Sequence, residues 1–471
     1  MIFFPSLAVL YYITPAKYRL FILLIGSYFF YLNVKPIYAL LLAVVTISTF
    51  YFTNLISKSK TESQRKTYMV INIILILLPL FCFKYFGSIN EGVFNFLQSL
   101  HIRWPLPEIK LLLPVGISFY TFVAIGYTVD VYNEEIEAEK KFGTLALFIS
   151  FFPLILSGPI ERAKNILPQF QQFKKPVYEM IVEGLKLMLW GYFMKLVVAD
   201  RVGLYIDAVY QNVPFHNSNS LLLATFLIPF QIYADLGGYS LIAIGTSSIL
   251  GIKVMHNFRR PFFATSMADL WRRWHISLIT WLTDYVYTPL AFSFRKYKIW
   301  GIIFALLITF LLSGLWHDAS LTFVVWGLLQ GIYLSLEALT NKKRTVFEKK
   351  YNLNNKAWYI FIEISIIFLL FSASQIFGRA SNIDTAFNIY HRIFSVSGPL
   401  FIGEAPSILI YSFLGILMLL VKDFTDEFTP TRFLLFENKS KFIRVIAYSS
   451  IVILILLIGV LDGGQFLYFQ F

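Results

Sequence analysis

Two histidines stand in strongly apolar stretches of this chain, and their side chains are the groups best suited to chemistry. His275 lies in the run Trp271-Arg-Arg-Trp-His-Ile-Ser277, and His317 lies in Gly314-Leu-Trp-His317. An imidazole has an unperturbed pKa of about 6.5, so it can take up and release a proton at neutral pH. An ionisable group in apolar surroundings loses solvation unless it is hydrogen-bonded, and such residues commonly mark function. The pair therefore predicts a proton-transfer site inside an apolar protein.

The composition predicts an all-α, polytopic integral membrane protein. Of the 471 residues, 57% are hydrophobic and only 14% are charged, and the mean hydropathy is +0.66. Soluble domains carry about 25% charged residues, and a water-soluble core could not bury this much apolar surface. With spans of about 20 residues, the chain has room for about ten to thirteen membrane segments. Basic loops between the apolar runs favour a cytoplasmic membrane, with most of these loops inside the cell.

Apolar runs separated by charged residues, proline or glycine define the expected segments. They lie near residues 1–13, 19–33, 38–57, 69–87, 111–132, 143–160, 180–199, 219–250, 298–315, 320–338, 357–377, 405–421 and 442–461. The first segment and the run 143–160 are candidates for re-entrant or interfacial helices. Glu161 and Arg162 are expected to mark a segment end rather than chemistry. No internal repeat or linker-like stretch is evident, so one domain over residues 1–471 is the simplest account.

Charge and cysteine content exclude further classes of protein. The net charge is +13, but the basic residues are scattered over short loops instead of forming one patch, so no nucleic-acid partner is expected. The single cysteine, Cys82, excludes an internal disulfide and a cysteine-rich metal site. No metal and no bound cofactor are expected. The remaining histidines are expected to be structural or solvated: His101, His216, His256 and His391.

The stretch 257–295 is too polar to face lipid and is expected to position the first histidine. Ser266 and Asp269 form a capping-box pattern, which predicts a helix start near Met267. Pro289 is expected to end or break this helix, which leaves about 22 residues and about 33 Å. Large apolar residues recur on one face at spacings of three and four: Trp271, Trp274, Leu278, Trp281 and Tyr285. An interfacial amphipathic helix is the alternative.

Five motifs follow one another along the chain. They are Phe230-Gln-Ile-Tyr-Ala-Asp-Leu-Gly-Gly-Tyr-Ser240, Asn257-Phe-Arg-Arg-Pro261, Trp271-Arg-Arg-Trp-His-Ile-Ser277, Trp281-Leu-Thr-Asp-Tyr285 and Gly314-Leu-Trp-His317. In this order they resemble the membrane-bound O-acyltransferase superfamily, and most closely its bacterial alginate O-acetylase branch, which includes peptidoglycan O-acetylation proteins. The resemblance covers most of the chain. A single Trp-His pair would be weak evidence, whereas five ordered motifs are specific.

The resemblance implies a fold, a reaction and partners. Tilted helices would surround a central tunnel through the bilayer, with His317 as the general base and His275 as an assisting residue that holds the donor or stabilises the oxyanion. Acetyl-CoA would be the acyl donor, and an extracytoplasmic polysaccharide, alginate-like or peptidoglycan, the acceptor. A periplasmic or extracellular SGNH-type acetyltransferase would be the partner, with membrane lipid around the chain. Alternatives are D-alanyl or other acyl transfer to teichoic acid, lipid or protein, and a polytopic transporter.

Further residues are expected to support the histidines or to line the tunnel: Trp271, Arg272, Arg273, Asp235, Asp284, Trp316 and Asp318. Arg272, Arg273 or Asp284 is expected to orient the first histidine. In an apolar helix Asp235 must be paired or protonated, and a structural pair with an arginine of 257–273 is favoured over a tunnel-lining role. Asp318 departs from the family pattern, in which glycine is usual, and either interacts with the second histidine or faces a loop.

The C-terminal sequence offers a second candidate site. The run Phe466-Leu-Tyr-Phe-Gln-Phe471 resembles a C-terminal tyrosine motif proposed as an acyl relay in this branch, and implies that Tyr468 receives the acetyl group from CoA through His317. An aromatic anchor for the last helix explains the same residues equally well. The pair Gly463-Gly464 favours the relay slightly, because glycines would let the tail fold into the tunnel mouth.

Overall fold

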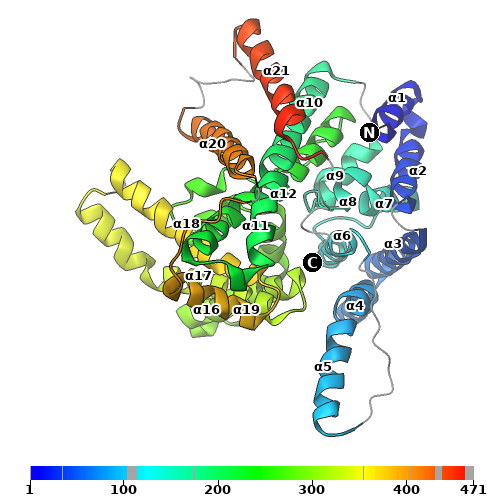
Figure 1. Cartoon of the computed structure of the whole chain (residues 1–471). Helices are drawn as coiled ribbons and strands as arrows, with labels where there is room; N and C mark the ends of the chain where they lie inside the picture. The colour runs from blue at the N-terminus through cyan, green and yellow to red at the C-terminus, as the bar shows by residue number, and fades with distance from the viewer. Residues whose placement is uncertain are drawn as a thin grey trace. The chain divides into compact units, whose positions relative to one another are not determined.

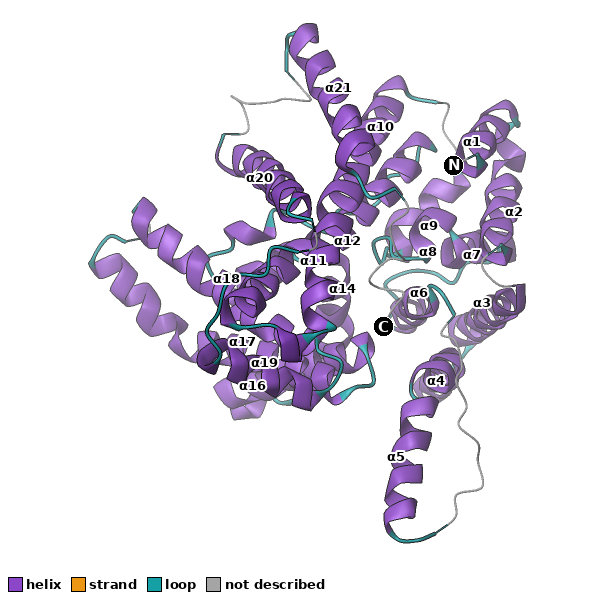
Figure 2. Ribbon diagram, viewed as in Figure 1, coloured by secondary structure: helices purple, strands orange, loops and turns teal. Residues whose placement is uncertain are grey.

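The computed structural model describes residues 2–33, 36–102, 114–172, 176–353, 355–403, 405–429 and 438–461. Throughout these residues the regular secondary structure is helical, and no strand is present (Figures 1 and 2). The all-α prediction is therefore confirmed. The chain divides into two compact units, of which one comprises Met1–Leu185 and Ala243–Met255 and the other Lys186–Ile242 and His256–Phe471. A single domain over residues 1–471 stays a prediction.

The first unit is built from short and long apolar helices. They are α1 (Phe3–Ile13), α2 (Arg19–Leu32), α3 (Pro36–Lys58), α4 (Glu62–Lys84), α5 (Phe86–Ser99), α6 (Ile117–Tyr132), α7 (Phe142–Ser150), α8 (Phe152–Ile155) and α9 (Ala163–Gln171), with the 3-10 turn η1 (Ala16–Tyr18). Most of α10 (Tyr178–Tyr192) and the end of α12 (Ser218–Ile249) belong to it as well. Asn72 on α4 donates a hydrogen bond to Thr128 on α6 at 2.8 Å, which pairs two buried polar groups.

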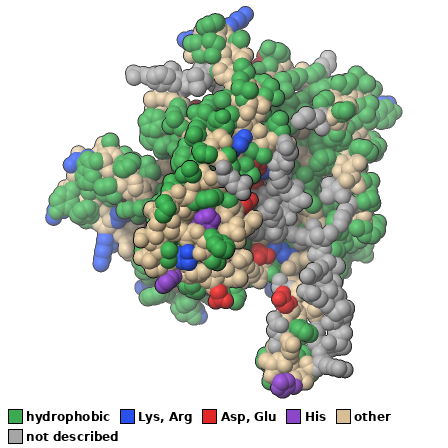
Figure 3. Space-filling view, viewed as in Figure 1, with side chains coloured by type: hydrophobic (Ala, Val, Ile, Leu, Met, Phe, Trp, Pro, Cys, Tyr) green, Lys and Arg blue, Asp and Glu red, His purple; other side chains and the backbone are tan. Residues whose placement is uncertain are grey.

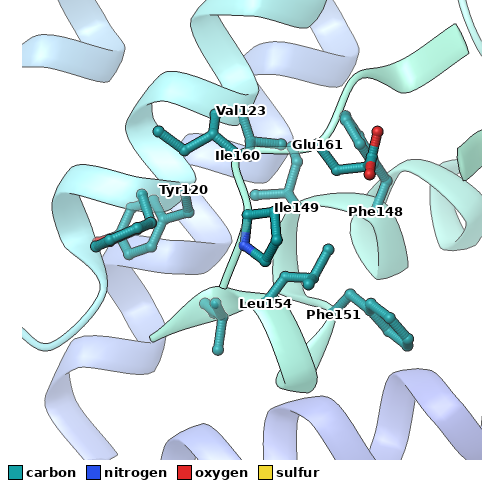
Figure 4. Close-up of a pocket in the computed structure, with 11 residues that line it drawn as sticks. Tyr120, Val123, Phe148, Ile149, Phe151, Leu154, Ile160 and Glu161 are labelled. Carbon is teal, nitrogen blue, oxygen red and sulfur yellow. The ribbon is translucent and has the colours of Figure 1, made fainter. Parts of the chain in front are cut away.

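A small cavity of this unit lies beside α6, α7 and α8 and has a volume of about 10 Å³ (Figure 4). That volume accommodates about one water molecule. Glu161 is the charged residue of its lining. Its carboxylate accepts hydrogen bonds from the Met255 amide at 2.7 Å and from the Asn165 side chain at 3.0 Å, so it braces local structure. The cavity is therefore no candidate for the chemistry.

The second unit contains both histidines singled out above. Its elements besides α12 are η2 (Phe193–Ala199), α11 (Asp200–Tyr210), η3 (Val213–Phe215), η4 (Pro261–Phe263), α13 (Met267–Arg273), α14 (Ile276–Leu282), η5 (Thr283–Tyr287), α15 (Thr288–Ser293), η6 (Arg295–Tyr297), α16 (Ile299–His317), α17 (Leu321–Lys350), α18 (Ala357–Arg379), α19 (Ile383–Ser395), α20 (Ser407–Phe428) and α21 (Lys441–Ile458). Both η2 and η5 are π-helical.

Eight helices in the described part of the chain are long and apolar enough to cross a membrane, namely α3, α4, α12, α16, α17, α18, α20 and α21. Hydrophobic side chains cover much of the face shown in Figure 3. Large ones are strongly exposed on the long helices, such as Phe361 on α18, which is 70% exposed, and Leu457 on α21, which is 75% exposed. Such side chains need lipid around them. The protein is thus a multi-pass membrane protein. Two of the expected segments are shorter apolar helices, α1 and the pair α7–α8, and these are the two that the sequence marked as candidates for re-entrant or interfacial helices.

Asp235 on α12 has a different partner from the one expected. Its carboxylate lies 2.5 Å from the ammonium of Lys195, which also lies 2.7 Å from Asp200. The predicted pair with an arginine of 257–273 is therefore wrong, whereas the requirement for a partner is met. The lysine stands in the π-helical η2, and no sequence pattern placed it beside α12. A buried carboxylate is costly to leave without a partner.

The closest helix packing of the second unit places His317. A Cβ added to Gly314 on α16 would lie 2.2 Å from the Phe323 carbonyl oxygen, and one added to Gly327 on α17 would lie 2.3 Å from that of Phe310. Small residues let two helices approach to backbone contact in this way. Since Gly314 precedes His317 by one helical turn, this contact fixes the histidine at the C-terminal end of α16.

The variant Gly327→Ala is expected to destabilise the protein by about 1–3 kcal/mol, because its methyl group would overlap a backbone oxygen that cannot move freely. Thermal unfolding in detergent should show a lower midpoint. Gly92→Ala on α5 is the matched control, since a Cβ there has nothing within 4 Å. Equal midpoints for the two variants would contradict the packing described for α16 and α17.

Candidate functional site

His275 lies at a break between α13 and α14 and not inside one continuous helix. Trp274 is extended, with φ −106° and ψ 127°, and His275 has the left-handed values φ 46° and ψ 49°. The prediction of one helix from Met267 to Pro289 is therefore wrong, although its start is confirmed. Pro289 does not end a helix either; the helical path runs without a gap through α14, η5 and α15, and the π-helical η5 directly precedes the turn that contains the proline.

Asn257 replaces hydrogen bonds that the break removes. Its carbonyl oxygen accepts from the Ile276 amide at 2.8 Å, and its side-chain oxygen accepts from the Ser277 hydroxyl at 2.9 Å and amide at 3.3 Å. Its side-chain nitrogen donates to the Ser240 hydroxyl on α12 at 3.0 Å. A left-handed residue other than glycine costs about 1 kcal/mol or more and persists only where its surroundings hold it. Asn257 therefore holds the backbone on which His275 stands.

The start of α13 is capped from two sides. The Ser266 hydroxyl accepts from the Asp269 amide at 3.0 Å, as the capping pattern predicts. Glu337 on α17 accepts from the Met267 amide at 2.8 Å and from the Ala268 amide at 3.2 Å. A carboxylate at a helix N-terminus is stabilised by the helix dipole. Nothing in the local sequence indicated Glu337, because it lies in a later apolar segment.

The charged residues expected to orient His275 are engaged elsewhere. Arg273 lies 2.9 Å from Asp269 and 2.9 Å from Glu427 on α20, so it ties α13 to that helix. The Arg272 side chain is 72% exposed and lies 3.9 Å from Asp269. Asp284 is exposed on η5. None of these three residues lines the cavity that contains the histidine. Arg273 instead connects α13 to α20 through its ion pair with Glu427.

Both histidines line one cavity of about 50 Å³ in the second unit. Its walls come from α12, α13, α14, α17, α18 and the end of α16. They are largely aromatic, with a few polar groups, and include Trp271, Trp274, Phe323, Trp326, Phe371, Gln375 and Arg379. A volume of this size holds about three to five water-sized groups. Among the described residues, no three His, Cys, Asp or Glu side chains gather in a metal-binding arrangement.

The two histidines differ in burial. His275 is 2% exposed, and burial lowers its pKa to about 3, so its imidazole is neutral at physiological pH. His317 is half-buried, and its ring lies 5.1 Å from that of Trp326. Trp316 contacts both histidine rings, at 6.3 Å from His275 and 4.7 Å from His317. One tryptophan therefore links the two imidazoles.

The three remaining predicted site residues differ in where they lie. Trp271 lines the cavity with the histidines. Asp318 caps the end of α16 in an extended conformation and is absent from the lining. Tyr468 lies outside the described residues. Three further residues of the cavity lining were not predicted from the sequence: Trp326, Gln375 and Arg379. The one signal available for them was that polar or aromatic side chains recur at helical spacing within an apolar run.

The chain is similar to known acyltransferases over most of its length. The model of the membrane-bound O-acyltransferase family matches residues 139–374, which include both histidines. A probable alginate O-acetylase of Pseudomonas aeruginosa is 32% identical over 405 residues, covering 84% of this chain and 73% of that protein. A peptidoglycan O-acetyltransferase of Helicobacter pylori is 28% identical over 80% of this chain and 74% of its own length. A teichoic acid D-alanyltransferase of Bacillus subtilis is 28% identical over 63% and 73%, respectively.

Asn257→Ala is expected to loosen the start of α14. The variant removes the acceptor of the Ser277 amide, and an unpaired buried donor costs about 1–3 kcal/mol, or roughly a 5- to 150-fold loss of amide protection. Hydrogen exchange of peptides covering residues 274–282 measures this protection. Ser277→Ala removes the hydroxyl alone and is the matched control, with a smaller expected change. Unaltered exchange in Asn257→Ala would show that something else holds the break.

Proposed function

The chain belongs to the membrane-bound O-acyltransferase family, and on this premise we propose that it transfers an acetyl group from cytoplasmic acetyl-CoA to hydroxyl groups of an extracytoplasmic polysaccharide. The observation that carries the proposal is the cavity of about 50 Å³ that both His275 and His317 line. The names of the relatives support O-acyl transfer, since they include an alginate O-acetylase and a peptidoglycan O-acetyltransferase. The acceptor is accordingly an alginate-like exopolysaccharide or peptidoglycan, and the protein resides in the cytoplasmic membrane.

In this mechanism His317 is the general base. Its half-buried ring at the end of α16 takes the proton of the attacking hydroxyl, a contribution that typically accelerates a reaction by about 10²- to 10⁴-fold. His275 holds the donor beside it. Because His275 is neutral, it acts through a hydrogen bond and not through a positive charge. The aromatic walls keep water from competing with the hydroxyl for the acyl group.

The lining of the cavity favours acetyl transfer over D-alanyl transfer. A D-alanyl group carries an ammonium, which needs a carboxylate or a comparable acceptor nearby. The cavity lining contains no Asp or Glu among the described residues, and it does contain Arg379. That guanidinium is paired with Asp207 and would repel a second cation. An uncharged acetyl group fits the aromatic walls without this cost.

We propose in addition that Tyr468 relays the acetyl group to a partner. The support is the resemblance of the run 466–471 to a C-terminal tyrosine motif, since these residues lie outside the described structure. Tyr468 would accept the acetyl group in the reaction that His317 assists and would present it to an SGNH-type acetyltransferase on the extracytoplasmic side. That partner would complete the transfer to the polysaccharide.

His317→Ala is expected to lower acetyl transfer from labelled acetyl-CoA by about 10²-fold or more, because the hydroxyl loses its proton acceptor. The assay follows the label into polymer in membranes that contain the full chain and its partner. The control is His391→Ala, which removes an exposed histidine on α19. If the His317→Ala variant labels the product at the wild-type rate, His317 is not the general base.

Tyr468→Phe separates the relay from an aromatic anchor. The phenyl ring keeps the anchoring surface and removes the hydroxyl, so polymer labelling should be lost while the amount of protein in the membrane is unchanged. Peptide mapping of the wild-type chain should reveal an acetyl group on Tyr468. Tyr351→Phe, at an exposed tyrosine after α17, is the control. Full polymer labelling by Tyr468→Phe would remove the relay and leave the anchor.

A further inference from the structure

The cavity wall contains two buried hydrogen-bond donors with no acceptor in the described part of the chain. They are the indole N–H groups of Trp271 and Trp326, and each side chain is 5% exposed. Buried polar groups are almost always paired, because a donor left alone in the protein interior loses its hydrogen bond to water without replacement. Both tryptophans line the cavity that contains the two histidines. An oxygen atom of a molecule bound in that cavity would satisfy such a donor.

Of the two indoles, that of Trp326 is the one beside the proposed base. Its ring lies 5.1 Å from the His317 ring at an interplanar angle of 84°. The Trp271 ring instead lies 5.1 Å from that of Phe310 and 6.0 Å from that of Trp326. The ring that carries the unpaired N–H of Trp326 therefore packs against the ring of the group that would remove a proton from the attacking hydroxyl.

Gly378 on α18 leaves space beside the indole nitrogen. A Cβ added to this residue would lie 3.9 Å from Nε1 of Trp326 and 3.2 Å from Oε1 of Gln375. Glycine, tryptophan and glutamine all belong to the cavity lining. Because Gly378 has no side chain, no side-chain atom of that residue crowds the indole nitrogen, which belongs to the cavity wall.

We propose that Trp326 is a catalytic residue whose indole N–H stabilises the oxyanion of the acyl transfer. This inference rests on the proposed function. As the hydroxyl oxygen bonds to the acyl carbon, the hydroxyl proton passes to His317, and the π electrons of the carbonyl move onto its oxygen, which accepts the hydrogen bond from Trp326. When the C=O bond re-forms, the C–S bond breaks, and the sulfur leaves with that electron pair and takes the proton from His317.

The test is a substitution that removes the N–H group and keeps an aromatic ring. Trp326→Phe is expected to lower kcat for acetyl transfer by about 10²- to 10³-fold, as the loss of one oxyanion donor does elsewhere. The Kd for acetyl-CoA should change less than about twofold, because the donor contributes in the transition state and little in the ground state. Trp190→Phe is the matched control, since Trp190 is buried but does not line the cavity.

A second replacement removes the effect of ring size. Benzothienylalanine at position 326 carries sulfur in place of the N–H group in a ring of nearly the same shape, and the same loss of kcat is expected. A wild-type kcat for the benzothienylalanine protein would overturn the role of Trp326, and so would a change confined to KM. If Trp326 proves dispensable while the His317→Ala variant is inactive, the proposed function stands and only the role of Trp326 is rejected. If the His317→Ala variant is active, the proposed function itself is rejected.

Discussion

The structure of the site depends on one constraint, namely that every backbone group freed from a helix in an apolar protein must find a new partner. The chain meets this constraint at Trp274 and His275, where the helical path stops for two residues and resumes. Asn257 supplies partners for the Ile276 and Ser277 amides with its carbonyl oxygen and its side-chain oxygen, and its side-chain nitrogen donates to the Ser240 hydroxyl. Because these bonds reach α12 as well as α14, the break is held between two elements. Its geometry is therefore a property of the packed unit and not of the local helix.

The two histidines reach one cavity by independent routes. His275 is presented by the break, and the preceding helix α13 is held by Glu337 on α17 and by the pair of Arg273 with Glu427 on α20. His317 is presented by the glycine contact between α16 and α17, where Gly314 allows the backbones to touch. A shift of either support would move one imidazole relative to the other. Aromatic side chains form the wall around the two imidazoles, so a donor and a hydroxyl bound there would be held close together.

The sequence predicted those features of the protein that depend on composition or on near neighbours. The helical membrane class follows from hydropathy, and the start of α13 follows from Ser266 and Asp269, which are close in sequence. The break at His275 could not be predicted, because its partner Asn257 is 20 positions away from Ser277 and acts through long-range hydrogen bonds. The helical periodicity of the tryptophans continues across the break and therefore concealed it.

The partner of Asp235 illustrates the same limit, since Lys195 lies 40 positions away in a π-helical turn. The motifs identified the histidines and Trp271, but the other wall of the cavity comes from α17 and α18, where Trp326 and Gln375 sit in ordinary apolar runs. Only the folded chain shows which side chains of those helices face inward. Charged residues near His275 in the sequence did not predict which side chains line the cavity, since Arg272 and Asp284 are exposed.

The central claim, that the cavity shared by the two histidines is the site of acyl transfer, is tested most directly by a cryo-EM structure of the full chain. The ligand would be an acetyl-CoA analogue in which a methylene group replaces the reactive sulfur. We expect the acetyl group between His275 and His317, with its carbonyl oxygen within hydrogen-bonding distance of the indole nitrogen of Trp326. An acetyl group bound away from both histidines would contradict the claim.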